Sequence, residues 1–350
     1  MGIVCERGCF PERRSYRATV FRPAPPSRES VRGSVREIVP SDSYLKFLRF
    51  FIVLFNRNLG ENVLEEYRDE IYGISLSCTH KYDFIGTPYE RQLNYHSAHD
   101  LGHAMQDYML VGCSSFATWG TQSADSSLLI GRNFDFYVGD AFAENKQVAF
   151  YVPEQGYRFA SVGWPGMIGV LSGMNETGLT VTINAAKSAV PTGSATPISI
   201  LTREILQYAA TIDEAFAIAQ KRETFVSESI LISSAKDGKA AIIEKSPEKT
   251  VLFTGKEANR LICTNHYQSE EFSKDERNME NIRTSDSPYR FARLTELINE
   301  DLPIDVSKAA SILRDHKGLQ NTDLGLANEM AINQFIAHHS VIFQPEKQLM

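Results

Sequence analysis

The sequence changes character at the pair Gly112-Cys113. Before this pair, residues 41–112 carry apolar side chains at helical spacing, most clearly between Leu59 and Ile74. After it, residues 113–187 alternate apolar and polar residues in short runs that are separated by Gly and Asn, a pattern typical of β-strands. The predicted strands in this part are 127–136, 148–152, 157–162 and 169–185, the last with a turn inside it.

Helices and strands then follow in blocks. Thr211 and Glu214 form a capping-box pattern, which predicts that a second helix starts there after a first one near Leu201. Asp237-Gly238 predicts a hairpin, and Pro288 predicts the first turn of a later helix. The remaining predictions are strands at 229–233, 240–244, 250–253, 260–265 and 340–343, with 250–253 paired to 260–265, and a helix at 305–315.

This order of blocks constrains the fold. Strands joined by short turns, with helices before, between and after them, suit an α+β fold of two packed antiparallel sheets covered by helices on both outer faces. A doubly wound parallel sheet is excluded, because its strands would need crossover helices between them.

Composition and charge divide the chain further. Residues 1–40 are rich in Arg, Ser and Pro and predict a disordered leader. Residues 41–112 form a helical segment, and residues 113–350 form the main domain. The 350 residues carry a formal net charge of −7, which argues against a nucleic-acid partner because such partners require a basic face.

The five cysteines are scattered and lack the spacing of a metal site or a disulfide framework. Cys113 differs from the others by its place at the change of character. If the Gly112–Cys113 bond is cut, Cys113 gains a free α-amine with a pKa of about 7.7–8.0, which can accept the proton of its own thiol. Taken alone, a Gly-Cys pair is also compatible with a structural cysteine.

Several motifs follow Cys113 in a fixed order. They are Gly131-Arg132-Asn133-Phe134-Asp135-Phe136, Gly163-Trp164-Pro165-Gly166, Gly173-Met174-Asn175-Glu176-Thr177-Gly178-Leu179 with Asn184, Cys263-Thr264-Asn265-His266 and Ser287-Pro288-Tyr289-Arg290-Phe291-Ala292-Arg293. From about residue 60 to the C-terminus, this ensemble resembles the choloylglycine hydrolase and penicillin acyltransferase superfamily of N-terminal-nucleophile hydrolases. It is most similar to the acyl-coenzyme A:6-aminopenicillanate acyltransferase-like branch, with acid ceramidase and N-acylethanolamine acid amidase more distant.

The resemblance implies a four-layer αββα fold, autocatalytic cleavage before Cys113 and attack on an acyl amide or thioester. It implies no cofactor and no metal, and a small subunit, 1–112, derived from the chain itself. Bile-acid conjugates, penicillins, N-acyl lipids and N-acyl amino acids all remain compatible as substrates. The residues that match family positions are Cys113 as nucleophile, Arg132 and Asp135 as the Arg-x-x-Asp pair, Asn184 in the oxyanion hole, Asn265 of the Thr-Asn motif and Arg290 as the late arginine.

Physical chemistry supports these roles. Asp135 can orient the α-amine, and Arg132 supplies a positive charge that favours the thiolate. Asn184 can donate to a developing oxyanion, an interaction of about 3–4 kcal/mol in the transition state. Arg290 can grip Asp135 or a substrate carboxylate through two hydrogen bonds.

Simpler interpretations stay open for the same residues. Arg132 and Asp135 can be a structural ion pair, and Asn184 can cap a turn. Asn265 and Arg290 are equally compatible with support of the site. We expect Trp164 and His266 to line the substrate pocket.

A histidine cluster gives a different hypothesis. His96, His99 and His103 lie at helical spacing before Cys113, and His99 with His103 could bind zinc. The Glu of a His-Glu-x-x-His motif is missing, so packing or hydrogen bonding near the cleavage site is the interpretation we favour. A histidine-rich metal-binding protein and a non-catalytic relative of the superfamily are the two alternatives to an enzyme.

The two ends of the sequence leave location and completeness open. No classical signal peptide opens the chain, and the apolar run Phe47–Phe55 is too short to span a bilayer. At the other end, the chain stops soon after the strand 340–343, so the main domain can lack its last strand.

Overall fold

The chain forms two β-sheets with helices packed against them. A computed structural model describes residues 3–7, 16–19, 56–84, 86–97, 100, 110–137, 143–189 and 195–350. The smaller sheet is antiparallel and has the strand order β12-β3-β4-β13. Its strands are β12 (Arg260–Cys263), β3 (Leu110–Thr118), β4 (Leu129–Tyr137) and β13 (Ala337–Phe343).

The larger sheet has the order β11-β10-β9-β8-β7-β6-β5-β1-β2 and is antiparallel except where β1 pairs with β5. Two of its strands, β1 and β2, lie in the segment 1–40, for which the sequence predicts disorder. The other residues of that segment lie outside the described ranges. The strand bounds are β1 (Ile3–Arg7), β2 (Tyr16–Thr19), β5 (Gln147–Tyr151), β6 (Phe159–Gly163), β7 (Ser172–Asn175), β8 (Leu179–Ala185), β9 (Glu228–Ser234), β10 (Lys239–Lys245) and β11 (Thr250–Phe253).

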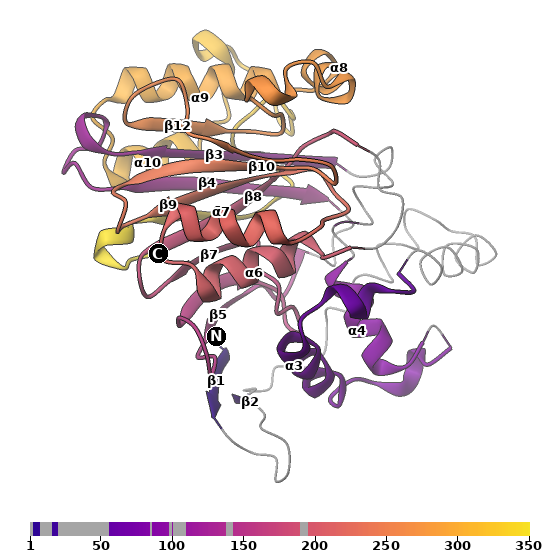
Figure 1. Cartoon of the computed structure of the whole chain (residues 1–350). Coiled ribbons are helices and arrows are strands. Elements are labelled where there is room, and N and C mark those ends of the chain that lie inside the picture. The colour runs from indigo at the N-terminus through magenta and orange to yellow at the C-terminus, as the bar shows by residue number, and fades with distance from the viewer. Residues whose placement is uncertain are drawn as a thin grey trace.

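The two sheets pack face to face, with β3 against β8 and β10 against β12, and helices cover their outer sides. Helices α6 and α7 contact the larger sheet, and α9 and α10 contact the smaller one (Figure 1). Strands β4, β8 and β9 are therefore buried on both faces along nearly their whole length. The α+β prediction of two packed sheets with outer helices is confirmed. These helices are α6 (Ile198–Tyr208), α7 (Ile212–Lys221), α8 (Glu276–Thr284), α9 (Ser287–Asp301) and α10 (Val306–Leu313).

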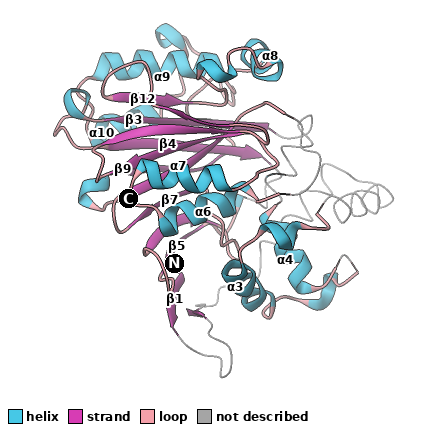
Figure 2. Ribbon diagram, in the orientation of Figure 1, coloured by secondary structure: helices cyan, strands magenta, loops and turns pink. Residues whose placement is uncertain are grey.

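Local sequence signals agree with this structure. Thr211 and Glu214 make both hydrogen bonds of the capping box that starts α7, and Pro288 lies in the first turn of α9. The Asp237-Gly238 turn joins β9 to β10. The alternation of helical and strand segments along the main domain is visible in Figure 2.

One predicted pairing is wrong. Strands β11 and β12 were expected to pair with each other, but β11 pairs with β10 and β12 pairs with β3. The connection 254–259 takes the chain from one sheet to the other, so each strand extends the sheet whose edge it reaches. Strand propensity in sequence does not identify the partner, because pairing depends on contacts between distant segments.

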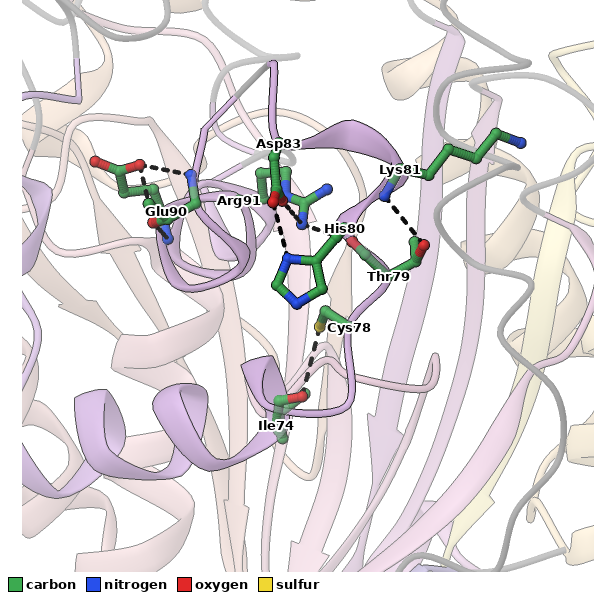
Figure 3. A network of polar contacts seen from close by, with 9 residues as sticks. Ile74, Cys78, Thr79, His80, Lys81, Asp83, Glu90 and Arg91 are labelled. Atoms are coloured by element: carbon green, nitrogen blue, oxygen red, sulfur yellow. Dashed lines mark hydrogen bonds and ion pairs between the residues drawn. The ribbon is translucent and has the colours of Figure 1, made fainter.

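The helical segment before β3 contains α3 (Glu65–Ser75) and α4 (Pro88–His96), which lie at one end of the molecule (Figure 1). Polar contacts link α4 to the segment that connects the two helices, as Figure 3 shows. The Asp83 carboxylate pairs with His80 Nδ1 at 2.8 Å and accepts from Arg91 Nη2 at 3.1 Å. The predicted helical segment 41–112 is too long at its C-terminal end, because Leu110 already begins β3. Residues 98–99 and 101–109 of that segment lie outside the described residues.

The described residues contain no helix that is long and apolar enough to cross a membrane. The apolar run 47–55 lies outside them. Strand β13 occupies one edge of the smaller sheet, so the expected strand near residue 340 is present and extends from Ala337 to Phe343.

Candidate active site

Cys113 lies within β3, on the face that turns toward the larger sheet, and its side chain is 1% exposed. It stands directly opposite Phe134 on β4. Arg132 lies on the same face, with Nη1 4.0 Å from the Cys113 sulfur and its guanidinium 4.6 Å from the centre of the Phe134 ring. Burial raises the pKa of the Cys113 thiol, and Arg132 opposes this rise. In the uncut chain, burial therefore outweighs the expected effect of Arg132 on the thiolate.

The backbone nitrogen of Cys113 is held by side chains. It donates to Asn265 Oδ1 at 2.8 Å, and the same oxygen accepts from Arg290 Nη2 at 2.7 Å. Arg290 Nη1 donates to the Cys113 carbonyl at 2.6 Å and to Ser114 Oγ at 3.1 Å. Two predicted residues from distant parts of the chain thus contact both backbone polar groups of the predicted nucleophile.

Asp135 lies on the opposite face of β4 from Arg132, because side chains three residues apart on a strand point to opposite sides. It is directly opposite Gly112 in the ladder and fully buried. Neither carboxylate oxygen has a hydrogen-bond partner among the described residues. Burial raises the pKa of Asp135 to about 8, against the opposing charges of Arg290 and Arg132.

This arrangement excludes one simpler interpretation and changes one prediction. Arg132 and Asp135 form no ion pair, although both side chains are described. Arg290 was expected to grip Asp135 or a substrate carboxylate. Its two terminal nitrogens instead donate to Cys113, Ser114 and Asn265, because α9 packs against β3.

Asn184 connects the two sheets close to Cys113. Its Oδ1 accepts from Ser115 Oγ at 3.0 Å, and its Nδ2 donates to the Cys263 carbonyl at 3.1 Å. Asn184 lies in β8 and is fully buried, so it does not cap a turn. Its amide group is within reach of the strand that carries Cys113.

Asn265 is itself positioned by a network. Its Nδ2 donates to the Ala185 carbonyl at 2.9 Å, and its backbone nitrogen donates to Ser287 Oγ at 2.7 Å. Ser287 also donates to Thr264 Oγ1 at 2.9 Å and lies 2.7 Å from His266 Nδ1. Burial lowers the pKa of His266 to about 4, with Arg290 adding to the effect. His266 therefore belongs to the support of Asn265 and packs edge-on against a phenylalanine ring of α9.

Trp164 belongs to an aromatic cluster beside the thiol. Its ring makes T-shaped contacts with Phe134, at 6.3 Å between centroids, and with His338, at 5.2 Å. Phe134 stacks on His339 at 5.4 Å and on Phe136 at 5.9 Å. The predicted pocket residue thus lies in an apolar layer that includes Cys113 itself.

The comparisons with known proteins add the family. The model of the acyl-coenzyme A:6-aminopenicillanic acid acyl-transferase family matches residues 121–335, more than half of the chain. The chain belongs to this family. The matched range includes Arg132, Asp135, Asn184, Asn265 and Arg290, whereas Gly112 and Cys113 precede it.

One relative and two solved structures are similar to this chain at low sequence identity. An uncharacterized protein from Archaeoglobus fulgidus is 27% identical over 150 residues, which are 42% of this chain and a quarter of that protein's length. A Caenorhabditis elegans N-acylethanolamine-hydrolyzing acid amidase ortholog has a TM-score of 0.49 at 17% identity, over 67% of this chain and 93% of that one. A mutant conjugated bile acid hydrolase from Clostridium perfringens has a TM-score of 0.41 at 14% identity, over 67% and 87%.

Of the three histidines at helical spacing, His96, His99 and His103, only His96 lies within the described residues. His96 lies 2.8 Å from the Gln92 carbonyl through Nδ1, and its Nε2 accepts from the Ile168 backbone at 3.0 Å. Both ring nitrogens are therefore engaged, and burial lowers the pKa of His96 to about 4. No group of three potential metal ligands exists within the described ranges, but His99 and His103 lie outside them, so the zinc hypothesis stays a prediction.

Sequence reasoning missed several residues of the site. Ser115 and Ser287 orient the two asparagines. Asn133 ties β4 to the end of α10, through the Leu313 carbonyl at 2.8 Å, and to the Ile332 carbonyl at 2.9 Å. Ser287 and Asn133 stand inside the quoted motifs, so their position was a usable signal. Ser115 could have been found from its alternation with Cys113 along one strand.

Proposed function

We propose that this protein is an autoproteolytic N-terminal cysteine hydrolase or acyltransferase that acts on a linear amide or a thioester. The observation that carries the proposal is the hydrogen bond from the Cys113 backbone nitrogen to Asn265 Oδ1. The nitrogen that would become the α-amine already has an oriented acceptor, and a buried carboxylate, Asp135, lies across the strand from the junction.

The first stage is self-cleavage. The Cys113 thiol loses its proton and attacks the carbonyl carbon of Gly112, and the carbon–nitrogen bond then breaks as the nitrogen takes up a proton. This shift leaves a thioester on Cys113 and a free α-amine. Water hydrolyses the thioester, which releases Gly112 with a new carboxylate and regenerates the thiol.

The second stage uses the new amine as general base. Its reference pKa of about 7.7–8.0 allows it to accept the thiol proton near neutral pH. Asn265 Oδ1 and the Asp135 carboxylate would orient the protonated amine, and a positive charge there would favour ionised Asp135. Arg132, 4.0 Å from the sulfur, would stabilise the thiolate.

The acyl-enzyme then forms on Cys113. The thiolate attacks the substrate carbonyl, the amine or thiol leaves with a proton, and water or another amine accepts the acyl group. Asn184 would donate to the oxyanion in both steps, since its amide lies beside the strand of the nucleophile. No metal or organic cofactor enters this scheme.

The small chain would stay attached after cleavage. Arg203 of α6 donates to Glu70 of α3 at 3.1 Å, and Tyr208 donates to Glu66 at 2.8 Å. Val63, Tyr67 and Ile71 pack with Ile168 and Ile200 in one buried cluster. These contacts join residues on the two sides of the Gly112–Cys113 bond, so they support a subunit of 1–112 rather than a released peptide.

Intact-mass measurement of the purified protein tests the proposal. We expect a large chain that starts at Cys113 and contains 350 − 112 = 238 residues. Cys113→Ala should give one uncut chain of 39.3 kDa. Two chains from Cys113→Ala, or a wild-type chain that stays whole and unreactive toward thiol reagents, would contradict it, and the latter result would indicate a non-catalytic relative.

A further inference from the structure

The side chain of Gln334 lies against the glycine that precedes the cleavage site. A Cβ atom built on Gly112 would lie 2.6 Å from Gln334 Nε2, 3.0 Å from Oε1 and 3.1 Å from Cδ. The whole terminal carboxamide group of Gln334 thus lies where a Cβ atom of residue 112 would make contact. A contact below 3.0 Å requires one of the two groups to move, so a larger residue at position 112 would have to displace the Gln334 carboxamide or shift its own backbone.

Gln334 is 7% exposed and is held in this position by its surroundings. Its Nε2 donates to the Glu329 carbonyl at 3.0 Å. The backbone carbonyl of Gln334 accepts from the Ala337 backbone nitrogen at 3.2 Å. The Phe136 backbone nitrogen donates to the Ile336 carbonyl at 3.1 Å, which attaches this segment to β4. The segment 329–337 is therefore a fixed strap across the end of β4.

The strap lies on the face of β3 opposite the thiol. Gly112 and Cys113 are neighbours on one strand, so their side-chain positions point to opposite sides. Cys113 points between the sheets, toward Arg132, whereas the Gly112 position points toward the strap. Gln334 thus lies on one side of β3 at Gly112, and the Cys113 sulfur lies on the other side.

The backbone of Gly112 gives no other reason for glycine. Its φ angle is outside the left-handed region that favours glycine, so an L-residue can adopt the same backbone conformation. Space is the remaining constraint, and the three atoms nearest to a Cβ at position 112 all belong to Gln334.

We propose that Gln334 is a positioning residue that selects glycine before the self-cleavage junction, because its carboxamide fills the space beside Gly112. This inference rests on the proposed function, because it concerns the first of its two stages. It adds a specificity element that contacts neither the sulfur nor the leaving nitrogen.

The test is the rate of self-cleavage of the full chain during cell-free synthesis, followed by intact mass at successive times. We expect Gly112→Ala to slow cleavage by about tenfold, because the added methyl group shifts the backbone of the junction away from its position beside the thiol. Gln334→Ala opens the space beside Gly112 without crowding it and should slow cleavage less. The double variant Gly112→Ala/Gln334→Ala should be faster than Gly112→Ala alone, because the space is open again.

Two controls make the result specific. Gly73→Ala, in α3, places a methyl group where no atom lies within 4 Å, and should leave cleavage unchanged. Each variant is also made together with Cys113→Ala, and thermal unfolding of these uncut chains shows whether they fold. Gln334→Ser, a second shortening of the side chain, should rescue Gly112→Ala in the same way.

The outcomes separate this inference from the proposed function. A wild-type chain that is never cut at Gly112–Cys113 overturns both. A wild-type chain that is cut, with folded double variants as slow as Gly112→Ala, overturns only the role of Gln334. Unchanged cleavage of Gly112→Ala would overturn it as well.

Discussion

Two groups of buried arginines differ in whether a carboxylate forms an ion pair with the guanidinium. They are Arg203 with Glu70, which we call the paired cluster, and Arg132 with Arg290 near Cys113. Arg203 is 2% exposed, and its guanidinium donates to Glu70, to Gln207 and to the Ile168 carbonyl, all at 3.1 Å. Burial alone would lower the pKa of Arg203, but Glu70 raises it above its usual value. Arg132 and Arg290, near Cys113, have their pKa values lowered by burial.

The difference indicates what each cluster does. Removing one partner of a buried ion pair is costly, so the Arg203–Glu70 pair holds α6 and α3 in a fixed arrangement. Around Cys113, by contrast, Asp135 has two buried oxygens without hydrogen-bond partners among the described residues, and both arginines lack a carboxylate partner there. Such incomplete pairing is maintained by the surrounding fold and is typical of functional sites.

The largest effect is expected when the paired cluster is broken. In a Cys113→Ala chain, which under the proposed function is not cut, Arg203→Met leaves Glu70 buried without its partner and should cost about 3–5 kcal/mol of unfolding free energy. Arg132→Met in the same chain should cost less, since Arg132 pairs with no carboxylate. Urea unfolding measures both.

A matched arginine on the surface provides the control for that prediction. Arg222 pairs with Glu204, and its side chain is 32% exposed. Arg222→Met should therefore cost at most about 1 kcal/mol. Equal losses for Arg203→Met and Arg222→Met would show that burial of the first pair does not matter.

The next effect concerns Asn184. Asn184→Ala should lower kcat/KM toward a panel of p-nitrophenyl acyl esters by about 10²–10³-fold, which corresponds to one oxyanion donor. Ser115→Ala removes only the hydroxyl that orients Asn184 and should cause a smaller loss. An Asn184→Ala enzyme with wild-type kcat/KM would exclude the oxyanion role.

The pH dependence of stability should report Asp135. Because burial raises its pKa to about 8, the native uncut chain retains a proton that the unfolded chain releases above about pH 4. The resulting stabilisation is complete below pH 4 and is lost as the pH rises through 8. We expect Cys113→Ala to lose stability between pH 5 and about 8.5 more steeply than Cys113→Ala/Asp135→Asn.

The comparison of those two chains removes other contributions. Burial lowers the pKa values of His96, His266 and His338 to about 4, which makes stability rise with pH between about 4 and 6.5. Both chains contain these histidines. Parallel pH profiles would therefore mean that Asp135 is ionised in the uncut chain.

The smallest effect on stability is expected at Tyr208, which lies in the same helix as Arg203. Tyr208→Phe removes one hydrogen bond to Glu66 and should cost about 1–2 kcal/mol without slowing self-cleavage. Thermal unfolding of the uncut chain and intact mass of the cut one measure the two parts. A slower cleavage would show that the two clusters are coupled rather than independent.

Most of the fold could be predicted from local signals. The capping box at Thr211, the Pro288 turn and the hairpin at Asp237-Gly238 each depend on residues within four positions of one another. The partner of β12 could not be predicted, because it depends on which sheet edge the chain reaches. That the side chains of Arg132 and Asp135 point to opposite faces follows from the two-residue repeat of a strand, so the sequence alone is enough to argue against an ion pair between them.

The sequence by itself predicted that strands begin near Cys113, although β3 already begins at Leu110, and it determined that the family motifs follow Cys113 in order. Only the tertiary structure decided that Asn265 accepts from the Cys113 nitrogen and that Gln334 fills the space beside Gly112. Motifs and periodicity report neighbours along the chain. These two contacts join residues that are more than a hundred positions apart, and only the packing of β3 against β12, α9 and the strap 329–337 brings them together.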